Sequence, residues 1–149
     1  MKKFSAKKII IFLLWAVLAL WVISRTPTGS VTKERLGVMV VDMGYLFGNS
    51  TILSRHENAK SGAALAVYDV DASTFSDKKS IALKESLKER GWTFAGEGDG
   101  VYVMCKSGMK FSISSVPNKE VVNGLERRTF SVSMEFNAGT EDFCRRRMH

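Results

Sequence analysis

The sequence has little of several residue types that would place it in a specialised class of protein. Its 149 residues include two prolines and twelve glycines, too few for collagen, a mucin stalk or a low-complexity array. Hydrophobic residues make up 45% of the chain, which excludes an intrinsically disordered protein, and the length predicts one domain. Neither G-x-S-x-G nor H-E-x-x-H occurs, and two histidines, His56 and His149, are too few for an ordinary zinc site. We therefore expect no metal and no cofactor.

The net charge of +7 is unevenly distributed along the chain. Four of the 22 Lys and Arg residues precede the first hydrophobic run, and the remaining 18 are set against 15 Asp and Glu residues. The rest of the chain is therefore only mildly basic. A nucleic-acid-binding protein would gather basic residues on one face with aromatic residues among them. The sequence shows no such pattern, so we expect no nucleic-acid partner.

A hydrophobic run covers Ile9 to Ile23 and has no charged or polar side chain. As a helix, it would rise about 1.5 Å per residue and span roughly 22 Å, which is short for a hydrocarbon core of about 30 Å. Lys7, Lys8 and Arg25 flank the run and can extend their charges to the headgroups. We expect a cytoplasmic basic segment at 1–8, then a transmembrane signal-anchor helix at 9–24, with the lipid bilayer as its partner.

A cleaved signal peptide is the competing interpretation, because a basic start and a hydrophobic run of this length fit it as well. The cleavage site favours the anchor, since no A-x-A sequence is present and the small residues around Ser24 and Ser30 form poor alternatives. Both interpretations place the positive charge in the cytoplasm and residues from Arg25 onward outside it. We predict a single-pass protein of the inner (plasma) membrane with an extracytoplasmic domain, periplasmic in a bacterium.

The first part of the exported chain gives weak patterns. Residues 25–35 are polar with Pro and Gly, which predicts a linker, and the β-branched run 36–43 predicts a strand. Residues 44–60 predict a loop, and 63–70 predict a second strand. The clearest helix covers 76–90, with Ser76 as its N-cap and Gly91 after its end.

The hydrophobic period changes from 3.6 to 2 after Gly91. Strands are predicted at 92–95, 101–106, 109–115 and 127–136, with a turn at 96–100 and a loop at 117–124. The fold class is therefore α+β: an exported domain at 36–149 with one main helix packed on an antiparallel β-sheet meander. The side chains expected to face the helix are Leu83, Leu87, Phe111, Ile113, Phe130, Val132, Met134 and Phe136.

The chain has two cysteines, Cys105 and Cys144. An exported domain lies in an oxidising compartment, and two cysteines allow one pairing, so we predict a disulfide between them. The alternatives are two buried thiols, or a reactive cysteine acting with His56. Nothing in the sequence around either cysteine would lower the pKa of its thiol.

Three aspartates before the helix resemble the start of a calcium loop. Asp69, Asp71 and Asp77 stand at positions one, three and nine of an EF-hand count. Thr74 then replaces the glycine required at position six, and Ser80 replaces the bidentate glutamate at position twelve. A polar strand-to-helix connection explains the segment better than a calcium site does.

The sequence contains no recognisable nucleophile, metal set or phosphate loop. We expect a membrane-anchored protein-binding module, such as an immunity or inhibitor protein or an accessory subunit of an envelope complex. The alternatives are a small envelope enzyme, for example a carboxylate-dependent hydrolase, and a cleaved secreted form of the same domain. A cleft enclosing two carboxylates, or His56 beside an acid, would favour the enzyme. The candidate partner-binding residues are Lys84, Lys88, Glu85, Glu89, Arg145, Arg146 and Arg147, although a solvated tail is the favoured interpretation of the last three.

Overall fold

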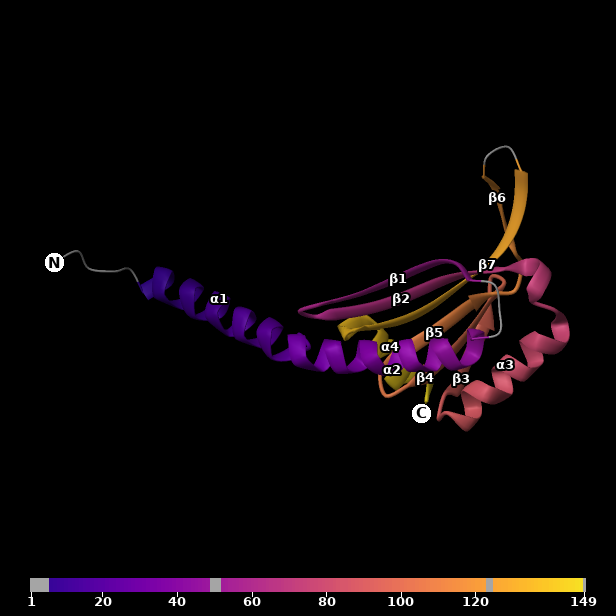
Figure 1. Ribbon diagram of the computed structural model, residues 1–149. Helices are drawn as coiled ribbons and strands as arrows, with labels where there is room; N and C mark the ends of the chain where they lie inside the picture. Colours follow the sequence, from indigo (N-terminus) through magenta and orange to yellow (C-terminus); the bar gives the residue numbers. More distant parts are fainter. Residues whose placement is uncertain (1–5, 49–51, 123–124, 149) are drawn as a thin grey trace.

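The computed structural model describes residues 6–48, 52–122 and 125–148. A long N-terminal helix projects from an α+β domain (Figure 1). The helices are α1 (Ala6–Arg25), α2 (Gly29–Phe47), α3 (Asp77–Glu89) and α4 (Ala138–Arg147), with one 3₁₀ turn, η1 (Ala72–Thr74). The strands are β1 (Ile52–Lys60), β2 (Ala63–Asp71), β3 (Thr93–Gly98), β4 (Val101–Lys106), β5 (Met109–Ser114), β6 (Asn118–Val122) and β7 (Leu125–Asn137).

The seven strands form one antiparallel sheet in the order β1-β2-β7-β5-β4-β3, and β6 pairs with the first part of β7. The predicted α+β class is confirmed, and so is the meander, because β3, β4, β5 and β7 are successive neighbours. Two tight turns set its register. Asp99 and Gly100 join β3 to β4, and Ser107 and Gly108 join β4 to β5, all four with positive φ. This conformation is that of the type I′ turn, whose twist matches antiparallel strands.

α2 corrects two sequence-based predictions. The predicted strand at 36–43 lies inside this helix, and the predicted linker at 25–35 is reduced to three residues between α1 and α2. The buried residues of α2 include Thr32, Met39, Met43 and Phe47, which recur at helical spacing and face the sheet. The valines of residues 36–43 favour a strand by their intrinsic propensity. The segment is nevertheless helical, because a helix buries Met39, Met43 and Phe47 together against the sheet.

Three further segments differ from the expectations. Residues 52–60 of the predicted loop 44–60 form the edge strand β1, and residues 118–122 of the predicted loop 117–124 form β6. The C-terminal residues form α4 instead of a solvated tail. The Asn137 side chain accepts a hydrogen bond from the N–H of Thr140, and Thr140 accepts one from the N–H of Asn137, so a capping box starts the helix.

The main core lies between the sheet and the helices α2 and α3. Its residues from α3 include Leu83 and Leu87, and those from the sheet alternate along each strand. Seven of the eight predicted inward side chains are buried, and Phe130 is half-buried. On β7, Val132 and Met134 face the core while Ser131 and Ser133 lie on the other face, so the predicted register is confirmed.

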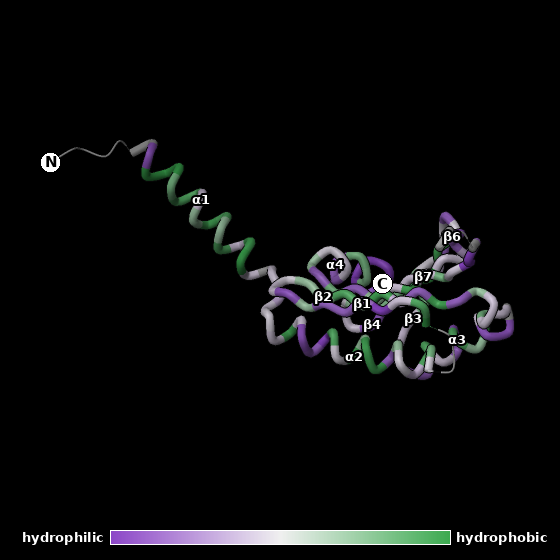
Figure 2. Tube along the Cα trace, turned by 45° about the horizontal axis from the view of Figure 1, so that its top comes forward, coloured by the Kyte–Doolittle hydropathy of each residue, from purple (hydrophilic) through white to green (hydrophobic). Residues whose placement is uncertain are grey.

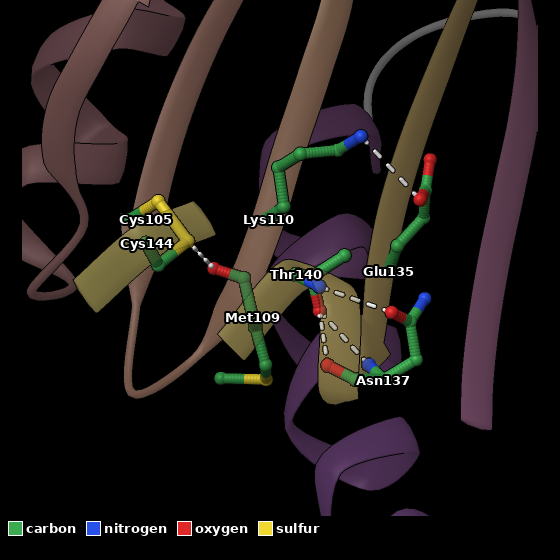
Figure 3. The surroundings of a disulfide bond; sticks show 7 residues. All are labelled: Cys105, Met109, Lys110, Glu135, Asn137, Thr140 and Cys144. Carbon is green, nitrogen blue, oxygen red and sulfur yellow. Dashed lines mark hydrogen bonds and ion pairs between the residues drawn. A yellow bond between two sulfur atoms is a disulfide. The ribbon is translucent and has the colours of Figure 1, made fainter. Parts of the chain in front are cut away.

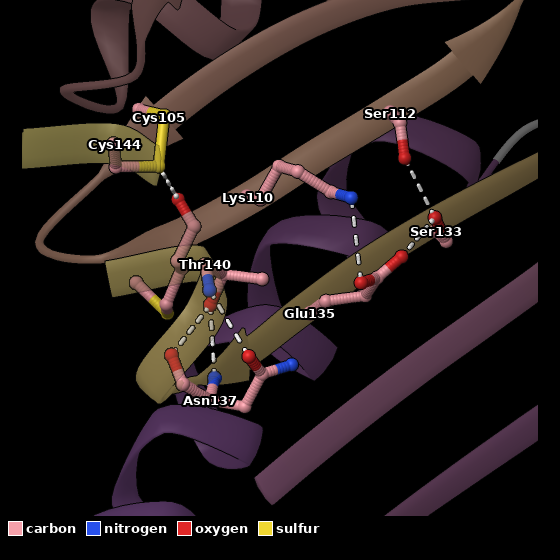
Figure 4. Close-up of polar contacts among 9 residues, drawn as sticks. Cys105, Lys110, Ser112, Ser133, Glu135, Asn137, Thr140 and Cys144 are labelled. Atoms are coloured by element: carbon pink, nitrogen blue, oxygen red, sulfur yellow. Dashed lines mark hydrogen bonds and ion pairs between the residues drawn. A yellow bond between two sulfur atoms is a disulfide. The ribbon is translucent and has the colours of Figure 1, made fainter. Parts of the chain in front are cut away.

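The opposite face of the sheet carries polar side chains on β5 and β7 and a small second core under α4. In Figure 4, Ser112 and Ser133 are joined by a hydrogen bond of 2.8 Å, and the Lys110 ammonium lies 3.4 Å from the Glu135 carboxylate. The second core contains Ala95 and the two cysteines. α2 and α3 therefore cover one face of the sheet, and α4 covers part of the other.

The predicted disulfide is present and links β4 to α4. The sulfur atoms of Cys105 and Cys144 lie 2.02 Å apart, and both residues are fully buried (Figure 3). The Cys144 Sγ also lies 3.3 Å from the backbone oxygen of Met109. A disulfide sulfur carries no proton, so this is a close contact and not a hydrogen bond. The bond fixes the C-terminal helix to β4, the strand next to the edge strand β3.

The apolar side chains of α1 are exposed. Figure 2 shows a continuous hydrophobic helix that stands apart from the domain, and the larger side chains from Ile9 to Ile23 lie on its surface. Among the described residues, one helical run, near the N-terminus, is long and apolar enough to cross a membrane.

Candidate functional site

The β6–β7 hairpin projects beyond the sheet (Figure 1), and an open cavity of the domain lies at its base. We call it the hairpin groove. It has a volume of about 770 Å³, which is within the usual range for a ligand-binding cleft. The groove is lined by Asp71, Ala72, Ser73, Phe75, Pro117, Glu126, Arg127, Arg128 and Phe130. It is formed by three segments: the end of β2 with η1, the residue before β6, and the first half of β7.

Two aromatic rings form the apolar part of the hairpin groove. The ring centroids of Phe75 and Phe130 lie 4.9 Å apart with an interplanar angle of 53°, and both side chains are half-buried. On its other side, Phe75 contacts Phe47 of α2, with ring centroids 6.4 Å apart. The aromatic pair is therefore supported by the main core and is held in place before any partner arrives.

The charged groups of the groove differ in whether they already have partners. The Asp71 carboxylate accepts a 2.8 Å hydrogen bond from the Ser73 N–H and caps η1. Hydrogen bonds to Ser73, and the charge of Arg127, hold the pKa of Asp71 below its ordinary value, so it is ionised at neutral pH. The Glu126 carboxylate lies 3.3 Å from the Lys119 ammonium.

The basic side chains of the groove form fewer hydrogen bonds and ion pairs than its acidic side chains. The side chains of Arg127 and Arg128 are exposed, and neither forms a side-chain hydrogen bond or ion pair with another described residue, although the charge of Arg127 acts on the Asp71 carboxylate. The groove therefore offers two guanidinium groups with unused donors beside an aromatic surface. Guanidinium groups and aromatic rings are enriched among the residues that dominate protein–protein interfaces.

A smaller cavity continues the groove toward α3. It has a volume of about 210 Å³ and shares Phe75 and Phe130 with the groove, and Lys84 and Tyr102 also line it. The Lys84 ammonium lies 4.0 Å from the centroid of the Tyr102 ring, a cation–π contact. One predicted partner-binding residue, Lys84, is thus placed beside the groove by the fold.

The other predicted residues of α3 lie on its exposed surface. The Lys88 ammonium and the Glu85 carboxylate form an exposed ion pair of 2.9 Å, and Glu89 is exposed. Exposed pairs of this kind contribute about 0–1 kcal/mol to stability. These side chains are available for a partner and contribute little to the fold.

The predicted basic residues of α4 form a separate surface. Arg145 pairs with Asp142, the Arg147 guanidinium lies 5.8 Å from the centroid of the Phe143 ring, and Arg146 is exposed. Because α4 and α3 pack on opposite faces of the sheet, these arginines and the α3 charges cannot form one continuous binding surface.

A buried ion cluster at Asp42 was not predicted. Its carboxylate, 1% exposed, accepts hydrogen bonds from the Arg90 Nε at 2.6 Å, the Trp92 Nε1 at 2.8 Å and the Lys106 Nζ at 2.9 Å. Burial alone would raise the pKa of Asp42, but the hydrogen bonds from Lys106, Trp92 and Arg90 outweigh it and lower that pKa. The cluster joins α2 to the end of α3 and to β4, so its role is structural.

The remaining predicted sites are not assembled. Asp69 pairs with Ser54 across the β1–β2 ladder, while Asp71 caps η1. His56 is exposed on the edge strand, paired in register with Val67. Within the described ranges, no group of three or more His, Cys, Asp or Glu side chains could hold a metal ion.

Sequence reasoning missed the groove because residues 118–122, which form β6, were interpreted as part of a loop, so the hairpin with β7 was not expected. The available signal was the pair Arg127 and Arg128 at the start of the clearest strand, next to Phe130. For Asp42, the signal was a single acid within an otherwise apolar run. No family model, curated protein or solved structure matches the chain, so the site has to be interpreted from its own geometry.

Proposed function

We propose that the chain is a membrane-anchored, extracytoplasmic protein-binding module, and that the hairpin groove receives an extended segment of its partner. An immunity or inhibitor protein, or an accessory subunit of an envelope complex, would have this organisation. The observation that carries the proposal is the combination, in one open groove, of a supported aromatic pair and two exposed guanidinium groups that form no side-chain hydrogen bond or ion pair with another described residue.

The anchor is supported by α1. Its apolar side chains would be costly to expose to water, and lysines precede it, which favours a cytoplasmic N-terminus. The orientation places the domain on the outer side of the membrane, where the Cys105–Cys144 disulfide would be stable.

A binding role suits the groove better than acid–base catalysis does. Two carboxylates, Asp71 and Glu126, line it, as a hydrolase would require. Asp71, however, caps η1 and has a lowered pKa, which disfavours a role as general acid, and Glu126 is exposed and paired with Lys119. The exposed guanidinium groups instead favour a partner segment that carries a carboxylate next to an apolar side chain.

The anchor is tested by N-terminal sequencing of the mature protein together with extraction of membranes at alkaline pH. We expect the intact N-terminus and retention in the membrane fraction. A mature chain that starts at Arg25 or Val31 would show a cleaved signal peptide and a secreted domain.

The groove is tested by photo-crosslinking in intact membranes. A benzoylphenylalanine placed at Ser73, which lines the groove, should yield a discrete protein adduct that mass spectrometry identifies. The matched control is the same group at Asn58, which is exposed on the edge strand. Equal adducts from both positions, or none from Ser73, would contradict the proposed groove.

Charge reversal with the partner identified by crosslinking gives a second test. Arg127→Glu with Arg128→Glu should slow association, most strongly at low salt, because exposed interfacial charges act mainly on the association rate. The control is Arg145→Glu with Arg146→Glu, the same change of charge on the opposite face of the sheet. If instead the purified chain hydrolysed an envelope polymer, and Asp71→Asn abolished this without unfolding, the enzyme alternative would replace the binding proposal.

A further inference from the structure

The outward face of α2 has properties that the single chain does not explain. After Glu34, the exposed residues of this helix carry no charge: Gly37, Val41, Gly44 and Tyr45. Val41 is 61% exposed; Tyr45, at the C-terminal end of the face, is 63% exposed and has the Arg90 guanidinium 4.7 Å from its ring centroid. A water-facing helix surface normally carries polar and charged side chains, so three turns without them indicate a surface that is covered.

The glycines on this face are not required by the packing of the chain itself. A Cβ atom added at Gly37 or at Gly44 would meet nothing within 4 Å, and neither residue has a positive φ. Glycine within a helix costs about 1 kcal/mol relative to alanine. The two glycines are seven residues apart, two helical turns, so they lie nearly one above the other and leave room for the backbone of a second helix.

Two free charges flank this face at its N-terminal end. At about 100° per residue, Lys33 and Glu34 lie roughly 50° to either side of the line through Gly37, Val41 and Gly44. Both are exposed, and neither forms an ion pair with another described residue. The face therefore has an uncharged centre with a cation on one flank and an anion on the other.

The pattern is self-complementary for a parallel pair of helices. In a two-fold symmetric pair, the left flank of one helix meets the right flank of the other, so Lys33 of each copy would face Glu34 of its partner copy. The two residues differ in height by about 1.5 Å along the axis. An antiparallel pair would place these charges at opposite ends of the contact and leave them unpaired.

The anchor supplies the parallel orientation. Only Thr26, Pro27 and Thr28 separate α1 from α2. Two copies inserted in one membrane in the same direction therefore present their α2 helices in parallel and at high effective concentration. We infer that the occupant of this face is a second copy of the chain, packed through Gly37, Val41 and Gly44 with reciprocal Lys33–Glu34 ion pairs. This inference rests on the membrane anchoring proposed above.

The test uses the full chain in liposomes. Donor- and acceptor-labelled populations, tagged at the N-terminus, are reconstituted at a fixed protein-to-lipid ratio and compared with the energy transfer expected for random placement. The wild-type chain should exceed the random level. Lys33→Glu and Glu34→Lys each turn both attractive pairs into repulsive ones and should weaken association about tenfold.

Mixing the two single variants tests the ion pairs directly, because a variant that had only lost its fold would not recover association in a mixture. Donor-labelled Lys33→Glu chains with acceptor-labelled Glu34→Lys chains place opposite charges together again, so energy transfer should return to the wild-type level. The double variant carrying both changes should recover as well. The matched control is Lys88→Glu or Glu85→Lys on α3, neither of which should change the signal.

Two outcomes would overturn the inference. One is energy transfer at the random level in every combination; the other is loss in the single variants without recovery in the mixture. Flotation of the same liposomes, which measures whether the chains are bound to the membrane, separates a failure of helix pairing from a failure of the anchor. Chains that float but do not associate refute the pairing alone, whereas chains that do not float refute the anchoring on which it rests.

Discussion

Replacing Asp42 by asparagine tests the buried ion cluster most directly. The change keeps the size of the side chain and removes its charge. Arg90 and Lys106 then lose the carboxylate to which both bind, and the Trp92 indole N–H keeps at most a neutral acceptor. We expect the variant to fold but to be markedly less stable.

The structure sets the size of the effect. Removing one partner of a buried ion pair costs about 3–5 kcal/mol, because the other charge is left without compensation. The Arg90 and Lys106 side chains are 28% and 23% exposed, so water can solvate part of each charge once the carboxylate is gone. We therefore expect the free energy of unfolding to fall by about 2–4 kcal/mol, slightly less than the cost of a fully buried pair.

Trp92 provides the assay. The chain has three tryptophans, and replacing Trp15 and Trp21 by phenylalanine leaves the buried Trp92 as the single indole reporter. Urea unfolding of the full chain in detergent micelles, followed by Trp92 emission, gives the stability of each variant. Glu89→Gln is the control, because Glu89 is exposed and its loss should change the stability by less than about 0.5 kcal/mol.

The pH dependence gives an independent check. The pKa of Asp42 is lowered from 3.8 in the folded protein. Its contribution is therefore fully present above the unfolded-state pKa and is lost as the pH falls through the folded-state value. The difference between wild type and Asp42→Asn should be constant near neutral pH and should shrink below about pH 4. A difference under about 0.5 kcal/mol at pH 7, or one that does not shrink in acid, would refute a stabilising cluster.

Three further changes should each alter the free energy of unfolding in the same assay. Replacing Cys105 and Cys144 by alanine opens a loop of 39 residues and should cost about 4 kcal/mol, whereas an unchanged value would refute a constraining bond. Asn137→Ala removes the cap of α4 and should cost about 1 kcal/mol, with hydrogen exchange increasing first in that helix. Leu87→Ala should cost about 2–5 kcal/mol and the exposed Ile81→Ala on the same helix less than about 0.5, and equal losses would show that α3 is packed differently.

Several features were determined by the sequence alone, because their signals are local. The run from Ile9 to Ile23 is too apolar for any exposed helix in water. Ser76 marks the start of α3 because its side chain caps the first turn, and Gly91 marks its end because glycine readily adopts a positive φ. The strict alternation along β7 specifies both its strand and its register, because a shift of one residue would exchange the buried and polar faces. The disulfide followed from the expected compartment and from the count of two cysteines.

Only the tertiary structure decided the elements whose local signals were ambiguous. The valines around Asp42 fit a strand or a helix, and the sheet selects the helix because it buries Met39, Met43 and Phe47 together. The central residues of β1, 54–58, are polar on both faces of the strand. Pairing with β2, and not the sequence of β1 itself, therefore makes this segment a strand. The hairpin groove brings residues 71–75 next to 126–130. No local pattern encodes that contact, because it depends on how β2 and β7 pair and on how far the β6–β7 hairpin extends beyond them.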